Sequence, residues 1–587
     1  MMRRYRTVIF SALLLATIAF VAHRWADLLQ RSVRAYTPPP VPMTTTPGER
    51  LPGLTDRVVM VVVSGVGYRE TVVQDMPVWQ GLMDTGASAP VQVRPPAYWP
   101  SVWATLLSGA GNDLNQAPLL PPDTENAVAL KVDNILIAAQ EAGLRIAVAA
   151  SADRAPLFTS IAADAVHIAH GDERVRDAQT VEAALGLIAE RQYPLIIIHL
   201  GLPEVVGRQS GTASTAYRAA LRQVDSYVRQ IVRQMNLADS VLLLTSDGAL
   251  LPDGRPAGGQ STPPTLPWVM VGQGVVTGKY SPIQLEDIAP TLAVLLGTRW
   301  PVMAEGLPLF DMLRLGGERL AHNWLLLATH KVAWGQAYLQ ALRRSSLPEV
   351  LQQDLSIAAT SLQRGNYAGA VAAAQLVSNE VAAIATKAAN TRIEAERWPR
   401  AFILAIGILA PSVFLWMRRP ARFALSFIAA LVTAAVLYAA YGLSGQNFSF
   451  DLLADASGYL AMPLMRDVLI GLVGGSLIVL AGFLSIPPVR WQTTMTVAYD
   501  YVLLTCYILA LPVWVAYWHH GAWMTWYLPD PAMLALQTLA LRHLAVLATV
   551  SLPVPWLLGL IIWFRERRRV QAIGRAQGWD PIAYLRR

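Results

Sequence analysis

Two polar residues stand where buried strands are expected to end. Val58–Val63 is an unbroken run of apolar, mostly β-branched residues that stops at the segment SGVG (64–67). Such a run predicts a strand buried on both faces, as in a parallel sheet covered by helices. Ligand sites of these sheets lie beyond the carboxyl ends of the strands, so Ser64 is placed where chemistry is expected. His199, near the end of Leu195–Leu200, either lies at the same edge or is a hydrogen-bonded core residue.

The elements that would position these residues extend from residue 57 to about residue 317. An amphipathic stretch, Ala216–Met235, has apolar residues at helical spacing and lies between two of the predicted strands. Alternating strands and helices predict an α/β domain with a mainly parallel sheet and flanking helices. The predicted strands are Val58–Val63, Arg145–Ala149, Leu195–Leu200, Ser240–Thr245 and Trp268–Val271.

The composition indicates a membrane protein of several domains. The chain has 587 residues, of which 54% are apolar and 15% charged, and its mean hydropathy is +0.37. A chain of this length is too long for one core, and this apolar content predicts membrane spans. The single cysteine, Cys506, excludes a disulfide framework and a cysteine-based metal site. The net charge of +7 comes from arginines beside apolar runs, so we expect no nucleic-acid partner.

Six apolar segments predict six membrane spans. The first is a retained signal anchor (1–29), followed by a Pro/Thr-rich linker (30–56). Residues 318–400 lack strand signals and predict a helical stalk broken at Leu347-Pro348 and Arg364-Gly365. A five-helix membrane region (401–564) and a basic tail (565–587) complete the chain. The five later spans are Ala401–Met417, Phe423–Leu443, Val468–Ile486, Val497–Trp518 and Leu541–Phe564.

Arginine clusters beside the spans predict the orientation in the plasma membrane. If the N-terminal arginines lie in the cytoplasm, alternating spans place every other cluster there too. Both termini are then cytoplasmic and the α/β domain faces outward. The clusters are Arg3, Arg4 and Arg6; Arg418, Arg419 and Arg422; Arg490; and Arg565, Arg567, Arg568 and Arg569.

Five passages of the α/β domain together resemble the type I phosphodiesterase/nucleotide pyrophosphatase branch of the alkaline phosphatase superfamily. They are VVMVVVSGVG (58–67), PPAYWPSVWATLLSG (95–109), LIIIHLGLPEVVGRQSG (195–211), VLLLTSDGAL (241–250) and LPWVMVGQGVVTGKYSPIQLEDIAPTLAVLLG (266–297). The resemblance implies an alkaline-phosphatase-like fold over residues 57–317. It also implies two divalent metals, usually zinc, held by Asp and His, and a Thr or Ser that attacks phosphorus.

Most of the residues that this resemblance calls for are replaced. Ser64 stands where the family has the aspartate that ends the first strand, and Glu204 and Arg208 stand for an Asp-x-x-x-His pair. Asp247 is retained, but the following histidine of the family is Gly248. The last histidine falls near Gly258–Gln260, where this chain has none.

The nucleophile position is equally altered. It is Tyr98 when the alignment is anchored on Pro100, and Trp99 when it is anchored on the segment TLL (105–107). Ser101 precedes an apolar helical run, so we expect it to be a helix N-cap, with nucleophile as the alternative.

Arginine never ligates a metal because its guanidinium stays protonated. We therefore expect no metal or other cofactor, and a pair between Arg208 and Glu204 or Asp247 in place of the metals. The alternative is that Arg208 points to solvent.

The predicted function is that of a catalytically inactive structural or assembly subunit of a membrane complex, whose partners are the lipid bilayer and other proteins. The alternative is an active phosphodiesterase or phosphotransferase on a lipid headgroup or nucleotide. Zinc or another divalent metal would then bind Asp247 and Glu204, and Tyr98 or Ser101 would attack. A third possibility is that Arg208 binds a phosphorylated ligand without cleaving it.

Overall fold

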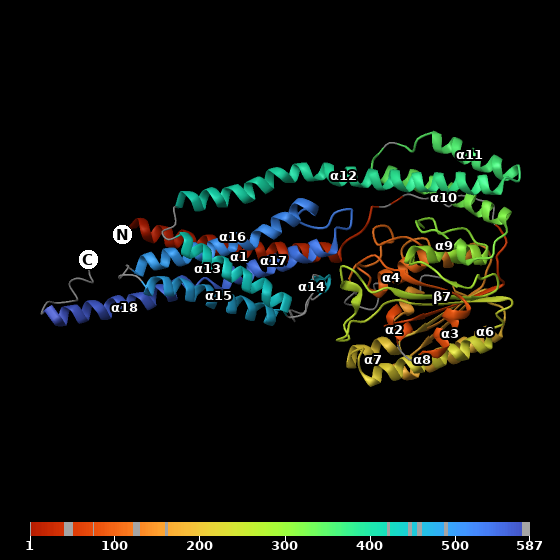
Figure 1. Ribbon diagram of the computed structural model, residues 1–587, viewed down its shortest axis with the longest axis horizontal. Helices are drawn as coiled ribbons and strands as arrows, with labels where there is room; N and C mark the ends of the chain where they lie inside the picture. The colour runs from red at the N-terminus through yellow and green to blue at the C-terminus, as the bar shows by residue number, and fades with distance from the viewer. Residues whose placement is uncertain are drawn as a thin grey trace. The chain divides into compact units, whose positions relative to one another are not determined.

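The computed structural model describes residues 2–39, 41, 51–73, 76–120, 130–158, 163–344, 346–418, 423–443, 449–454, 461–485 and 491–577 (Figure 1). The chain forms two compact units. The first contains residues 34–395 and 525–528, and the second contains residues 1–33, 396–524 and 529–587.

The first unit is built on a nine-stranded sheet with the order β4-β3-β5-β1-β6-β7-β2-β8, in which β9 also pairs with β2. Only β7 is antiparallel to its neighbours β6 and β2, so the predicted mainly parallel α/β sheet is confirmed. All five predicted strands are present, with small shifts at their ends. The strands are β1 (Arg57–Val63), β2 (Ala87–Gln92), β3 (Ile146–Ser151), β4 (Ala165–Ala169), β5 (Leu195–Leu200), β6 (Ser240–Ser246), β7 (Leu266–Gly272), β8 (Gly278–Lys279) and β9 (Ile283–Gln284).

The sheet is covered by helices on both faces because its central strands are apolar on both sides. In β1, Val58, Met60 and Val62 point into one core and the alternate valines into the other. The first core is closed by α4 (Trp99–Ser108), α5 (Ile135–Glu141) and α9 (Ile288–Leu296). The second is closed by α3 (Pro77–Thr85), α6 (Glu173–Ala189) and α8 (Thr215–Gln234). Figure 1 shows α4 and α9 on one side of β7, and α3 and α8 on the other.

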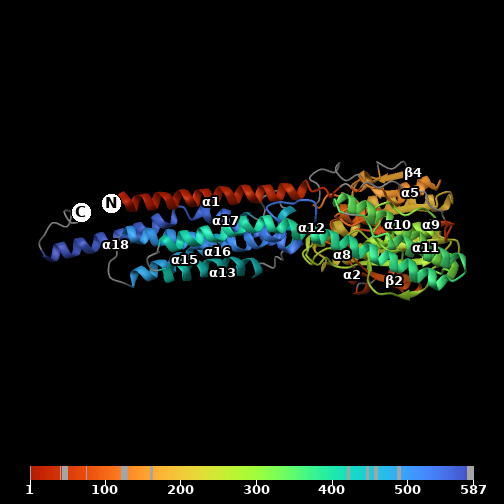
Figure 2. The same ribbon diagram turned by 90° about the horizontal axis from the view of Figure 1, so that it is seen from above.

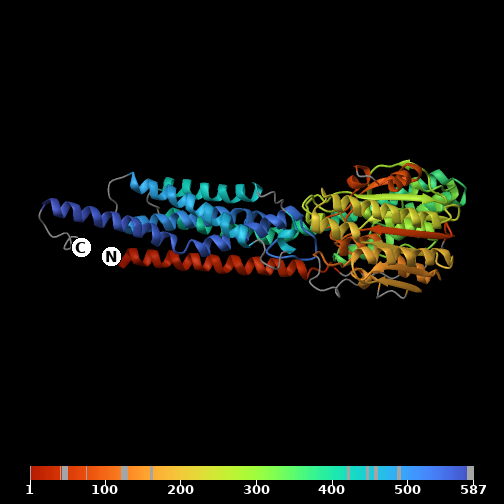
Figure 3. The same ribbon diagram turned by 90° about the horizontal axis from the view of Figure 1, so that it is seen from below.

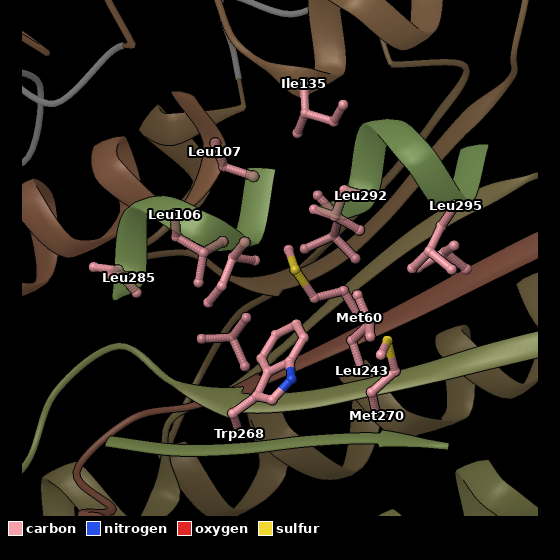
Figure 4. Close-up of a cluster of buried hydrophobic side chains, with 14 of the residues drawn as sticks. Met60, Leu106, Leu107, Ile135, Leu243, Trp268, Met270, Leu285, Leu292 and Leu295 are labelled. Carbon is pink, nitrogen blue, oxygen red and sulfur yellow. The ribbon is translucent and has the colours of Figure 1, made fainter. Parts of the chain in front are cut away.

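The close-up in Figure 4 shows how the first core is filled. Met60, Leu243 and Met270 rise from neighbouring strands toward Leu106 of α4 and Leu292 of α9. On the opposite face, α8 lies with α7 (Leu202–Ser210) in front of the strands when the unit is seen from below (Figure 3). The sheet is thus held between two helical layers, which leaves the ends of its strands as the place for a site.

Residues 318–395 belong to the same unit as the sheet, so the predicted boundary at residue 317 does not separate two bodies. They form α10 (Gly317–Ala341), α11 (Val350–Gln363) and the first part of α12 (Tyr367–Arg418). The two predicted breaks, at residues 347–348 and 364–365, lie in the connections between these helices. Leu327 of α10 lies in the first core, and Val377 of α12 packs in a cluster with Ala110. Helix α12 also continues through the predicted boundary at residue 400, although Pro399 and Pro411 lie inside it.

The second unit is a helical bundle. Within the described residues, six helical segments are long and apolar enough to cross a membrane, the number predicted, as expected of an integral membrane protein. Figure 2 shows α1 along one side of this bundle and α13 along the other. Its helices are α1 (Met2–Arg34), the second part of α12, α13 (Phe423–Leu443), α15 (Ala461–Leu484), α16 (Trp491–His520), α17 (Pro531–Val550) and α18 (Val554–Gln577), with a short α14 (Asp451–Ala454).

The last predicted span, Leu541–Phe564, lies within the sixth of these segments, Pro531–Ala572, but it is not one unbroken helix. The chain turns at residues 551–553 between α17 and α18. Pro553 accounts for the interruption, because proline lacks the N–H that a continuous helix needs there. The orientation of the spans stays a prediction, and three of its arginines, Arg419, Arg422 and Arg490, lie outside the described residues.

Candidate functional site

The candidate site lies where four neighbouring parallel strands end. The order β3-β5-β1-β6 sets their carboxyl ends side by side, and Val63 of β1 lies opposite both Leu200 of β5 and Ser246 of β6. The segments that follow these strands therefore meet at one edge of the sheet. They contribute Arg154 after β3, Glu204 after β5, Ser64 after β1 and Asp247 after β6.

A buried arginine occupies the centre of this edge. Arg154 Nε donates to Asp247 Oδ2 at 3.3 Å, and its Nη2 donates to Glu204 Oε2 at 2.9 Å and to Ser64 Oγ at 3.3 Å. Its side chain is only 4% exposed. Burial by itself lowers the pKa of Arg154, but Asp247 and Glu204 outweigh this effect and raise it above its usual value. Arg154 is thus a fixed positive charge shared by two carboxylates.

Further contacts hold this guanidinium in place. Its third nitrogen, Nη1, donates to Asp153 Oδ2. Burial raises the pKa of Asp153, but Arg154 and other neighbours outweigh it, so that the pKa lies below its usual value. The ring of Trp99 lies 4.1 Å from the guanidinium carbon, a distance at which an aromatic face attracts a cation. All three nitrogens are bonded and one face is stacked, so Arg154 has a single well-defined position.

A tryptophan of the helix layer above the sheet also holds the side chain of Asp247 in place. Trp103 of α4 donates its Nε1–H to Asp247 Oδ2 at 2.8 Å. This helix begins at Trp99, with Tyr98 as the N-cap residue. The predicted N-cap role of Ser101 is therefore wrong: Ser101 lies inside the first turn, is buried, and donates its hydroxyl to the carbonyl oxygens of Pro96 and Tyr98.

His199 lies beneath the arginine and is neutral at ordinary pH. Its Nε2 lies 2.8 Å from Ser64 Oγ, and its Nδ1 lies 3.0 Å from Ser151 Oγ. Burial, reinforced by the charge of Arg154, lowers the pKa of His199 to about 4. A serine beside a histidine is the arrangement of an activated nucleophile. Ser64 is fully buried, however, so no substrate reaches its hydroxyl in this conformation.

Glycine is required where β1 meets α7. Gly65 has φ +79°, and a Cβ at this position would lie 2.5 Å from the Cα of Glu204. Only glycine adopts this conformation readily and permits so close an approach. The approach brings Glu204, in the first turn of α7, within reach of Arg154. Burial raises the pKa of Glu204, although Arg154 opposes this effect.

A small pocket of about 100 Å³ adjoins the arginine cluster. Tyr98, Trp99, Arg208 and Gly258 line it together with the two carboxylates, whereas Ser101 does not. Arg208 is 58% exposed, and its Nη1 lies 3.5 Å from Glu204 Oε1. The predicted pair with Glu204 is thus present, but it lies at the surface. The cation at the centre of the cluster is Arg154, which corrects the hypothesis that Arg208 takes the place of the metals.

The residues present do not fit the two metals that the resemblance implies. One oxygen of each carboxylate, Glu204 Oε2 and Asp247 Oδ2, accepts a hydrogen bond from Arg154. A divalent ion beside them would meet the full charge of this guanidinium. Among the residues that the structure describes, no three His, Cys, Asp or Glu side chains are grouped to hold a metal ion.

Sequence reasoning found part of this site. Ser64, Glu204 and Asp247 meet around one cation, with Tyr98 and Arg208 beside them, as the alignment of positions suggested. It missed Arg154 and Trp103. The available signal was the segment SADR (151–154), which places two charged residues directly after a buried strand, at the edge where ligand sites lie.

Comparisons with known proteins find partial similarity. No family model matches the chain. It is 30% identical over 136 residues to the 2,3-bisphosphoglycerate-independent phosphoglycerate mutase of Serratia proteamaculans, and 32% identical over 138 residues to that of Cronobacter sakazakii. Each match covers 23% of this chain and 26% of the relative, so the chain matches about a quarter of their length. Human ectonucleotide pyrophosphatase/phosphodiesterase 5 is 12% identical, with a TM-score of 0.34, over 44% of this chain and 100% of that chain.

Proposed function

We propose that the chain is a membrane-anchored, catalytically inactive relative of the alkaline phosphatase superfamily that serves as a structural or assembly subunit of a membrane complex. One observation carries the proposal: a fully bonded, buried arginine is held by the carboxylates that a metal would need. The five sequence passages that resemble the superfamily place these carboxylates at its metal positions.

The energetics of the cluster support the loss of activity. A buried pair that loses one partner leaves an uncompensated charge, at a cost of about 3–5 kcal/mol. To bind the carboxylates, a divalent ion would have to displace Arg154, whose nitrogens also contact Ser64 and Asp153. The fold therefore keeps an ion pair where the superfamily keeps its metals. A fold can be retained for a function other than its family's reaction. For a chain with several membrane spans, the simplest such function is the binding of a protein partner.

The orientation is part of the proposal. From the arginine clusters beside the spans we infer that the α/β unit lies outside the cytoplasm, where it would meet partners at the outer surface of the plasma membrane.

The experiment is a combined metal and turnover measurement on the full chain in detergent. After dialysis against a mild chelator and addition of zinc or manganese, we expect metal contents well below one equivalent and no hydrolysis of phosphodiester or phosphomonoester substrates above background. One or two tightly held ions, with turnover that Asp247→Asn abolishes and the surface variant Arg255→Gln retains, would overturn the proposal and restore the phosphodiesterase or phosphotransferase alternative.

The pocket beside Arg208 favours a second candidate function, the binding of a small phosphorylated ligand without cleavage. An exposed guanidinium at the rim of a pocket of about 100 Å³ suits a phosphate group. Titration of the full chain with inorganic phosphate and with a nucleoside monophosphate tests it: saturable binding that Arg208→Gln removes would support this role, and the absence of binding at millimolar concentrations would exclude it.

A further inference from the structure

The bundle contains a long apolar groove of about 440 Å³. It runs between α1, the second part of α12 and α16, with two leucines of α17 at its base. An aromatic contact marks each end: the ring centroids of Phe10 and Phe414 are 5.9 Å apart, and those of Trp25 and Trp514 are 6.0 Å apart. Figures 2 and 3 both show α1 along one side of the bundle, so the groove borders the outside of the bundle and not its central core.

The groove is not a site for water. Water in a buried space needs two to four polar partners. The hydroxyls in the wall already have partners: Thr17 donates to the carbonyl of Leu13, and Tyr507 is bonded to Ser412. The remaining lining is almost entirely apolar.

Leaving the groove empty would be costly. Empty apolar volume destabilises a protein in proportion to its size, so a groove of about 440 Å³ is expected to be filled. The groove is also open at its side, because Phe10 is 53% and Val21 51% exposed. In a bilayer, the medium at that opening is the hydrocarbon of the lipids.

A cation stands beside one end of the groove. Trp25 donates its Nε1–H to the carbonyl of Ala522, and a Cβ on the neighbouring Gly521 would lie 3.4 Å from the Arg400 guanidinium. Arg400 is 12% exposed and donates to the carbonyl of His519; Glu396, at 3.5 Å, balances part of its charge. The tryptophans at this end are typical of the level of lipid headgroups. An apolar channel that ends beside an arginine matches a lipid with an anionic phosphate.

We propose that this groove binds one phospholipid, with an acyl chain between α1, α12 and α16 and its phosphate beside Arg400. The bound chain fills the gap between α1 and α16 over the length from Phe10 to Trp25. It thereby joins the N-terminal anchor to the rest of the bundle. This site is independent of the arginine cluster in the first unit.

The test is native mass spectrometry of the full chain, purified in a mild detergent and titrated with phosphatidylglycerol. We expect one phospholipid retained per chain. Ala510→Trp, which places a large side chain in the groove, should weaken retention about tenfold or more. The matched control Val515→Trp changes a lipid-exposed residue of the same helix outside the groove and should bind like the unaltered chain. Arg400→Gln should reduce the preference for phosphatidylglycerol over phosphatidylcholine.

A second measurement covers the possibility that Ala510→Trp misfolds. In nanodiscs of phospholipid with brominated acyl chains, tryptophans that touch the bound chain are quenched, so Trp25→Phe and Trp514→Phe should each lower the quenched fraction. No saturable lipid binding, equal retention by Ala510→Trp and Val515→Trp, or unchanged quenching in both phenylalanine variants would each overturn the proposal.

Discussion

Two clusters in the first unit share the same ingredients but differ in burial. In each, one arginine binds carboxylates from distant parts of the chain. Arg154 is 4% exposed and joins Asp247 and Glu204, whereas Arg94 is 50% exposed and joins Glu286 and Glu305 at 2.9 and 3.0 Å. The carboxylates are equally buried in the two clusters, at 2% and 16% exposed, so the clusters differ in the exposure of the arginine.

The carboxylates of the two clusters differ in their hydrogen-bond partners and in their pKa values. Both oxygens of Glu204 have a partner, Arg154 or Arg208. In the Arg94 cluster, Oε2 of Glu286 has no hydrogen-bond partner among the described residues. Burial raises the pKa of Glu286 to about 7, although Arg94 opposes it, and burial with the charge of Glu305 raises the pKa of Asp113 to about 6. Thus the buried arginine is a structural ion-pair centre, while the half-exposed one leaves groups that titrate near neutral pH.

The largest expected effect separates the two arginines directly. Arg154→Ala should lower the free energy of unfolding by about 3–5 kcal/mol, because it leaves the buried Asp247 without its arginine partner and Glu204 with only the exposed Arg208. Arg94→Ala should cost less, because Glu286, although only 2% exposed, has a pKa already raised to about 7 and can take up a proton when its counter-charge is removed. Denaturant unfolding of the full chain in detergent, followed by tryptophan fluorescence, measures both. Equal losses would contradict the distinction between the clusters.

The pH dependence of stability should have opposite signs in the two clusters. The folded pKa of His199, about 4, lies below its unfolded value of 6.5, so its contribution is complete above pH 6.5 and is lost toward pH 4. The folded pKa of Glu286, about 7, lies above its unfolded value of 4.5, so stability falls as the pH rises from 4.5 to 7. Each contribution amounts to about 3 kcal/mol, and in the unaltered chain they largely cancel.

Two variants separate these contributions. Relative to the unaltered chain, Glu286→Gln should remove a fall in stability between pH 4.5 and 7, and His199→Gln should remove a rise between pH 4 and 6.5. The measurement is the unfolding midpoint of the full chain at several pH values. Parallel slopes in the two variants would show that the assignment of these pKa shifts is wrong.

Removal of Arg154 should also create a site for a cation. In Arg154→Ala, zinc or manganese should bind between Asp247 and Glu204 and raise the unfolding free energy by about 2.7 kcal/mol at a hundred times its dissociation constant. The unaltered chain and Arg94→Ala should show no such shift. Scanning fluorimetry with and without the metal measures it, and the effect should vanish in the double variant Arg154→Ala/Asp247→Asn. A metal shift of equal size in the unaltered chain would show that the arginine does not exclude cations.

The smallest effect is expected at the surface. Arg208→Ala should change the free energy of unfolding by less than about 0.5 kcal/mol, because its guanidinium is 58% exposed and Glu204 keeps its shorter contact with Arg154. The same unfolding measurement decides this. A loss as large as that of Arg154→Ala would return Arg208 to the centre of the cluster.

The sequence by itself determined the elements of this protein. Unbroken apolar runs predicted five strands of the sheet, since burial on both faces leaves no alternation, and long apolar segments predicted six spans. The positions of Ser64, Glu204 and Asp247 followed from the resemblance to known enzymes. These properties are local or can be matched by alignment. The strands β2, β4, β8 and β9 carry no such run and were not predicted.

Only the tertiary structure decided which charges meet. The strand order decided which arginine balances the charge of Asp247. It makes the end of β3 a neighbour of the end of β5 and brings both near the end of β6. The packing of α10 against the sheet likewise rests on distant partners such as Leu327 in the first core. The contacts of a loop residue such as Arg154 come from strands that are distant in the sequence, so the local spacing of residues does not predict them.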